Sequence, residues 1–408
     1  MSTTTSTTTG SAYRWVVLLL SWAAFTMTSV DRSTWGPASA SVSDSLGVPL
    51  AALGIFATCY YVGYVVSNAG GGFLTDWLGG RKVLGTTSLV AGGLMVLFGS
   101  TTSMAMGLVV QGALGLFAGA DFSAGLKLIT SWFRPEDRGF ASGVFMTATS
   151  LGTVVANAVV PSLIASSGWQ ASYHLFGGVT VVLAVLCLLF IRDGERSGDA
   201  PGRRPVPDLR PLLRNRDLLL LGLAGFGGLW GTYGFVTWSN TLMVKGNGIS
   251  PIDAGVVLVI FSGTAVAVKP LVGFVTDKMG LGRRIPTVAI LFLFGATLLV
   301  FGRMTSYQAF LWVAPLLGVA AYAYSPLTAA LTPTLTGARL AGSAAGAVNA
   351  LWQLGSVIVP AVVGPVFQAT HSFYSAFVVL AAGPILGGLV MLGVRDDRPV
   401  RPGPSPVA

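Results

Sequence analysis

The chain has 408 residues, of which 53% are hydrophobic and only 10% are charged, and its mean hydropathy is +0.73. This composition excludes a soluble domain and indicates a protein that crosses a lipid bilayer many times. The net charge of +9 would suit a nucleic-acid-binding protein, but the distribution of the cations between apolar segments argues against that class.

Apolar segments begin soon after the first residues. Residues 1–13 are rich in threonine, serine and glycine, so we expect a disordered N-terminal tail. Twelve segments follow, each long enough to cross the roughly 30 Å hydrocarbon core of a bilayer. They are predicted at 14–40, 50–75, 81–101, 104–132, 138–166, 170–192, 217–245, 252–276, 284–302, 305–333, 338–368 and 372–394. The sequence therefore predicts an all-α integral membrane protein.

The longest polar stretch divides these segments into two sets of six. Residues 193–216 are rich in arginine, proline, glycine and aspartate, which is typical of a linker between domains. We expect an N-terminal lobe over 14–192, a C-terminal lobe over 217–395 and a C-terminal tail over 396–408.

The cations predict the orientation in the membrane. With the N-terminus placed inside, nineteen of the 24 lysines and arginines fall on the inner side, and only Lys245 and Arg303 fall on the outer side. Positive charge is concentrated in cytoplasmic loops of membrane proteins, so both termini are expected in the cytoplasm and the protein in the cell (inner) membrane.

One loop occurs twice, about half a chain length apart. The residues from Gly72 to Lys82 read GFLTDWLGGRK, and those from Gly273 to Arg284 read GFVTDKMGLGRR. Both resemble the loop signature of the major facilitator superfamily, whose members are transporters with two similar six-helix lobes. The resemblance implies a tight polar hairpin with a hinge and charge-clamp role for the residues Gly72, Asp76, Arg81, Lys82, Asp277, Arg283 and Arg284.

Five charged residues fall within predicted membrane segments. They are Asp31, Arg32, Asp121, Lys127 and Lys269. A charge inside a bilayer is costly, so such residues usually face a water-filled path or pair with one another. We expect the three cations to bind substrate, and the two acids to carry protons. An ion pair within one lobe, or lysine side chains that reach toward the membrane surface, are the alternative interpretations.

Adjacent positions on a helix point about 100° apart, so Asp31 and Arg32 cannot both face one cavity. We expect Arg32 to face a central cavity and Asp31 a neighbouring helix. Polar and aromatic side chains in other segments complete the predicted site. They are Tyr60 and Tyr64 in the second segment, Tyr233 in the seventh, and Asn349, Trp352 and Gln353 in the eleventh. Helix packing is the alternative for each of them.

The Asp31-Arg32 pair and the run from Lys127 to Arg138 resemble the anion:cation symporter branch of that superfamily. The resemblance implies that Arg32 binds an anion and that Asp31 takes part in proton coupling. Gln111 and Ala118 stand where those relatives carry an arginine and an acid. Separately, Lys269-Pro270 is similar to the Arg-Pro pair of monocarboxylate and oxalate carriers, which implies that Lys269 meets a carboxylate.

The leading hypothesis is proton-coupled symport of a small organic anion by alternating access of the two lobes. The alternative is a proton-driven exporter of drugs or metabolites, but the fifth segment lacks a Gly-Pro-rich motif before Pro161. A carrier that does not couple transport to protons is a further alternative. No catalytic set is present, so an enzyme is not expected. His174 and His371 lie far apart, so neither a metal nor a cofactor is expected. The resemblance implies a monomer.

Overall fold

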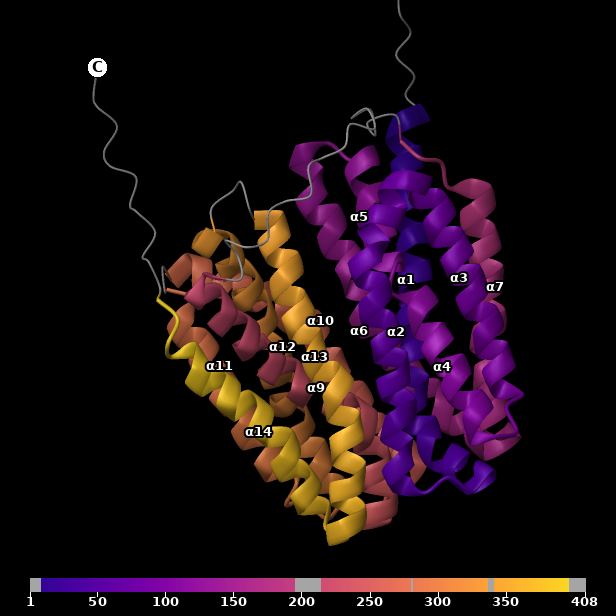
Figure 1. Ribbon diagram of the computed structural model, residues 1–408, viewed down its shortest axis with the longest axis vertical. Coiled ribbons are helices and arrows are strands. Elements are labelled where there is room, and N and C mark those ends of the chain that lie inside the picture. The colour runs from indigo at the N-terminus through magenta and orange to yellow at the C-terminus, as the bar shows by residue number, and fades with distance from the viewer. Residues whose placement is uncertain (1–8, 195–213, 280–281, 337–340, 396–408) are drawn as a thin grey trace, which may run out of the picture.

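The computed structural model describes residues 9–194, 214–279, 282–336 and 341–395 (Figure 1). The tail 396–408, most of the N-terminal tail and most of the linker lie outside the described residues. Within them the chain is helical and no strand occurs. The first-half helices are α1 Thr9–Leu46, α2 Leu50–Leu78, α3 Gly80–Gly99, α4 Met104–Ala118, α5 Asp121–Trp132, α6 Pro135–Ser167 and α7 Trp169–Phe190. The second-half helices are α9 Arg216–Asn247, α10 Pro251–Met279, α11 Arg284–Phe301, α12 Tyr307–Thr336, α13 Ala341–Thr370 and α14 Phe373–Met391.

The prediction of twelve membrane segments is confirmed. The described residues contain twelve helical spans that are long and apolar enough to cross a bilayer. One of them, Met104–Trp132, consists of α4 and α5, which meet at a short turn at Gly119 and Ala120. The first helix begins at Thr9, so the last residues of the predicted disordered tail are helical.

The two halves of the chain form two helical bundles (Figure 1). We call the side of the molecule that holds the start of α1, the end of α7 and the start of α9 the linker side, and the opposite side the far side. The bundles lie against each other toward the far side and diverge toward the linker side (Figure 1). Between the bundles, α2 packs along α13, α6 along α10, and α1 along α9.

The repeated loop has the same structural role in both bundles. At the start of α3, the Arg81 Nε donates a hydrogen bond of 2.9 Å to the carbonyl oxygen of Leu188 near the end of α7. At the start of α11, the Arg284 guanidinium donates to the carbonyl oxygen of Leu392, just after α14. Each arginine therefore ties the third span of its lobe to the sixth.

The hairpin itself is shorter than the sequence indicated. The helix α2 continues through the polar motif to Leu78, so Gly72 lies inside a helix and the turn is made by Gly79. Gly79 has a φ of 90°, a conformation that glycine adopts without steric cost. Lys82 is exposed, and Arg283 lies just before α11. The side chains of Asp76 and Asp277 lie outside the described part.

Glycines bring the two lobes into backbone contact on the far side. A Cβ atom at Gly54 of α2 would lie 1.8 Å from the carbonyl oxygen of Pro360 in α13. A Cβ atom at Gly36 of α1 would lie 2.7 Å from the carbonyl oxygen of Val236 in α9. Any larger residue would overlap the opposite backbone, so this close fit depends on glycine.

Polar contacts join the same surfaces. Asn240 Nδ2 donates to Asn157 Oδ1 at 2.8 Å, and the Thr58 hydroxyl donates to the carbonyl oxygen of Val357 at 2.9 Å. At the edge, Lys245 pairs with Asp44 at 2.8 Å, but both side chains are partly exposed. Exposed ion pairs contribute about 0–1 kcal/mol, so the backbone contacts and buried hydrogen bonds are the stronger part of this closure.

Candidate functional site

A cavity of about 220 Å³ lies between the lobes. The helices α1, α2, α5 and α6 line it from the first lobe, and α9, α10, α12 and α13 line it from the second. Its position between two pseudo-symmetric bundles is where a transporter of this architecture binds its solute.

Arg32 enters this cavity from α1. Its guanidinium lies over the ring of Tyr233 at 5.1 Å and over that of Tyr64 at 5.9 Å. Its Nη2 atom lies 3.4 Å from the hydroxyl oxygen of Ser29 one turn earlier. Tyrosine faces attract a cation without neutralising it, so the positive charge stays available to a solute.

Lys269 enters from α10 on the opposite wall. Its Nζ atom donates to the Ser150 hydroxyl of the first lobe at 3.3 Å and lies 5.1 Å from the centre of the Tyr322 ring. In the part of the chain that the structure describes, no aspartate or glutamate lines the cavity. The site therefore contains two cations on facing walls and a positive potential.

Asp31 points away from this cavity, as the helical geometry indicated. The carboxylate is buried with 3% of the residue exposed, and it accepts a hydrogen bond of 3.4 Å from the Thr180 hydroxyl of α7. It therefore lies inside the first lobe, on the side of α1 that faces α7 and away from the side that presents Arg32. No ion pair joins it to Arg32 in the described residues.

Asp121 is enclosed in the same lobe. Its carboxylate accepts hydrogen bonds from the hydroxyls of Thr28 at 2.6 Å, Thr87 at 2.5 Å and Ser88 at 3.2 Å. The residue has no exposed surface and does not line the cavity. These bonds join α1, α3 and α5, which supports a structural role.

Lys127 is also outside the cavity lining. Its Nζ atom donates to the carbonyl oxygen of Thr75 at 2.8 Å, near the end of α2. The contact connects α5 to the first copy of the repeated loop on the linker side. The structure thus brings two of the three predicted cations together and places the third elsewhere.

Most other predicted residues do line the cavity. They are Tyr64, Tyr233, Asn349, Trp352 and Gln353. Tyr60 is the exception, because it lies deeper, where it lines a much smaller pocket of about 10 Å³. Its hydroxyl is buried and has no hydrogen-bond partner in the described structure.

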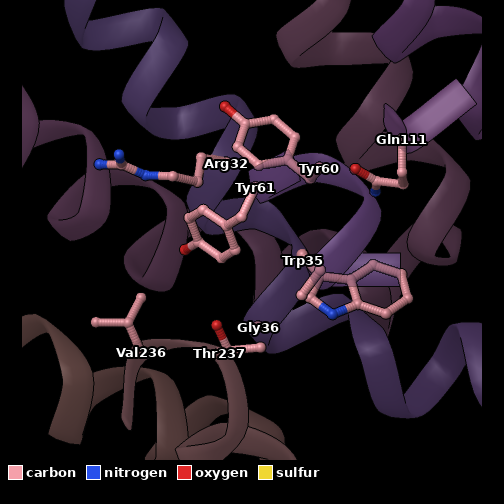
Figure 2. A pocket seen from close by; sticks show the side chains of 9 residues that line it. Arg32, Trp35, Gly36, Tyr60, Tyr61, Gln111, Val236 and Thr237 are labelled. Atoms are coloured by element: carbon pink, nitrogen blue, oxygen red, sulfur yellow. The ribbon is translucent and has the colours of Figure 1, made fainter. Parts of the chain in front are cut away.

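This small pocket lies beside Arg32, among side chains of α1, α2, α4 and α9 (Figure 2). Arg32 lines both the pocket and the cavity. In Figure 2 the rings of Tyr60 and Tyr61 lie between Arg32 and the side chains of Trp35 and Gln111. Tyr61 packs edge-on against Tyr233 of the other lobe at 5.4 Å, so these rings form part of the barrier between the cavity and the far side.

Sequence reasoning missed one wall of the cavity. Thr149, Ser150 and Thr153 of α6 line it, with Ser33 of α1 beside them. Ser33 and Thr153 hydroxyls lie 3.1 Å apart. The signal was the i, i+4 spacing of two threonines in an otherwise apolar segment, which places both on one helix face.

Comparisons with known proteins agree with this architecture. The chain is 23% identical to the probable galactarate/D-glucarate transporter GudP of Bacillus subtilis (strain 168), over 93% of this chain and 92% of the relative. It is 24% identical to the probable sulfoacetate transporter SauU of Cupriavidus necator, over 90% of each chain. Among solved structures, a bacterial homolog of the human lysosomal transporter Spinster, inward-facing and occupied, superimposes with a TM-score of 0.77 at 14% identity. That match covers 93% of this chain and 95% of the solved one.

The model of the Major Facilitator Superfamily matches residues 21–360. The predictions of family, of a twelve-span all-α fold and of a transporter and not an enzyme are therefore confirmed. The chain belongs to the Major Facilitator Superfamily.

Proposed function

We propose that the protein carries a small organic anion across the cell (inner) membrane together with protons, by alternating access of its two lobes. One observation carries this proposal: Arg32 and Lys269 face one cavity from opposite lobes, and no acidic side chain of the described residues lines it. A single cation would hold an anion against one lobe only, whereas two cations on facing walls let an anion bridge both lobes. The names of the relatives, which are transporters of galactarate/D-glucarate and of sulfoacetate, support an anionic solute.

The linker side is proposed to face the cytoplasm. Most cations of the described residues lie on this side, in accord with the positive-inside rule, and the lobes are in contact on the far side. The structure then corresponds to a state that exchanges its solute with the cytoplasm. Rocking of the lobes about the cavity would break the far-side contacts and open the site to the outside.

Asp31 is the proposed proton carrier. Its carboxylate accepts a hydrogen bond from the Thr180 hydroxyl inside the lobe, and the residue is the immediate neighbour of Arg32 on α1. A proton on Asp31 removes a negative charge beside Arg32, so the cavity attracts an anion more strongly. By linkage, a bound anion favours protonation of Asp31, and the two solutes then move in the same direction. Asp121 is not given this role because three hydroxyls hold it within the lobe.

Replacing Asp31 by asparagine is expected to uncouple the anion from the proton. The amide mimics the protonated acid, so anion exchange between two equal pools is retained. Accumulation driven by an imposed pH gradient falls to the level of simple equilibration. Uptake of a radiolabelled carboxylate into proteoliposomes, with and without the gradient, measures both quantities.

Asp253→Asn is the matched control. Asp253 accepts a hydrogen bond from the Ser250 hydroxyl at the start of α10, far along the chain from Arg32. It should accumulate the anion as the parent protein does. Gradient-driven accumulation by Asp31→Asn at the parent level would contradict the assignment. Uptake by the parent protein that ignores the gradient would contradict proton coupling altogether.

A further inference from the structure

The cavity wall consists largely of aromatic rings. The second lobe contributes Tyr233, Tyr322, Tyr324 and Trp352, and the first lobe contributes Phe25, Tyr64 and Phe122. Tyr322 is half-buried, whereas Tyr324 is fully buried and stacks at 6.4 Å on Phe294 behind it. A solute held between the cations therefore meets ring surface on both sides.

Three hydroxyl groups of the wall already donate their protons to backbone carbonyl oxygens. Thr149 donates to the carbonyl oxygen of Met146 at 3.0 Å, and Ser325 donates to that of Tyr322 at 3.1 Å. Thr232 donates to the backbone of its own helix at 3.0 Å. A hydroxyl whose proton is used in this way can only accept a further hydrogen bond.

The indole of the wall is engaged as well. Trp352 Nε1 donates to the carbonyl oxygen of Leu221 at 3.2 Å, so the indole presents its face and not its N–H group. A polyhydroxylated sugar acid needs many donors and acceptors when it leaves water. The amides of Asn68, Asn349 and Gln353 and the tyrosine hydroxyls are the main side-chain groups of the wall that remain for this purpose.

Each cation also lies over a ring. Arg32 is 5.1 Å from the centre of Tyr233, and Lys269 is 5.1 Å from the centre of Tyr322. A carboxylate bound to either cation must carry its carbon skeleton beside an aromatic face. A flat, apolar skeleton fits this arrangement, because aromatic rings attract one another beyond the effect of burial.

We propose that the solute is an aromatic carboxylate and not a polyhydroxylated sugar acid, an inference that rests on the proposed anion transport. The carboxylate group binds between Arg32 and Lys269, and the ring of the solute packs against Tyr322 and Trp352. Tyr322 and Trp352 then determine specificity, whereas Arg32 and Lys269 determine that the solute is an anion.

Calorimetric titration of the purified protein tests this with three ligands: phenylacetate, cyclohexylacetate and D-gluconate. Phenylacetate is expected to bind tightest. Cyclohexylacetate is expected to bind roughly two- to tenfold more weakly, because it lacks the ring–ring attraction. D-Gluconate is expected to bind at least about tenfold more weakly, because its hydroxyls leave water without full compensation.

Four variants show which residues produce the preference. Tyr322→Leu should bring the affinities for phenylacetate and cyclohexylacetate closer together, and Tyr322→Phe should keep the parent ratio because the ring is retained. Tyr374→Leu is the matched control, since Tyr374 lies near Arg303 and outside the cavity. Trp352→Leu provides an independent reading if Tyr322→Leu does not fold.

The outcomes separate the two proposals. Tighter binding of D-gluconate than of phenylacetate, or equal binding of the two ring-bearing acids by the parent protein, overturns the aromatic preference and leaves anion binding in place. An unchanged ratio in the folded Tyr322→Leu and Trp352→Leu variants overturns it too. If the neutral phenylacetamide binds as tightly as phenylacetate, or no carboxylate binds, both proposals fail.

Discussion

Replacing Arg32 by glutamine is expected to abolish anion uptake while leaving the protein folded. The guanidinium faces the cavity and is paired with tyrosine rings and not with a carboxylate, so its removal leaves no buried acid unpaired. Hydrogen bonds to a charged group contribute about 1.5–3 kcal/mol, so affinity for a carboxylate should fall about 10- to 100-fold. Uptake by proteoliposomes and calorimetric affinity measure the two effects.

Two matched variants show whether the position of the charge matters. Arg303→Gln removes an exposed cation near Tyr374 and should leave affinity unchanged. Lys127→Gln removes a cation from a predicted membrane segment, but one that bonds to Thr75 and does not line the cavity, so affinity should also be retained. Equal loss in Lys127→Gln and Arg32→Gln would show that the cavity is not the binding site.

Replacing Gly54 by valine is expected to stop the transport cycle without weakening the binding site. The new Cβ atom would lie 1.8 Å from the carbonyl oxygen of Pro360, a backbone atom that cannot move aside alone. The far side could then close only with a distortion. Overpacking of this kind costs about 1–3 kcal/mol, which would shift the population roughly 5- to 150-fold toward a state open on the far side.

Gly93→Val is the control for this change, because space is open where its Cβ atom would stand in α3. Opening can be followed by labelling a cysteine introduced at Ala57, which lines the small pocket, in a protein without Cys59 and Cys187. Gly54→Val should label faster from the far side and transport at less than a tenth of the control rate, in line with that estimated shift. Transport at the rate of Gly93→Val would contradict the closed arrangement.

The fold was predictable because its determinants are local in the chain. Apolar length defines each span, and the repeated loop shows the two-fold organisation; Arg81 and Arg284 make equivalent bonds in the two lobes. Arg32 and Lys269 were predictable for a related reason. A charge within an apolar segment is costly, and this cost indicates a polar cavity whatever the packing around it.

The rest of the site depends on packing that periodicity does not encode. Tyr60, Tyr64 and Asn68 share a helix face, but Tyr60 lies a turn deeper in the closed part, because spacing gives direction and not depth. Asp121 is enclosed by hydroxyls from α1 and α3, and these partners cannot be predicted from its own segment. Lys127 bonds to Thr75 of another segment, and the sequence of its own segment does not indicate this partner.

Thermal stability of the purified protein with pairs of carboxylates and their neutral amides tests the central claim, that the cavity is built for an anion. A ligand that binds the folded state raises the melting temperature by mass action. We predict that the carboxylates raise it, that the amides do not, and that Arg32→Gln removes the difference. An equal rise with the amides, or a rise with carboxylates that persists in Arg32→Gln, would show that the two facing cations do not bind the solute.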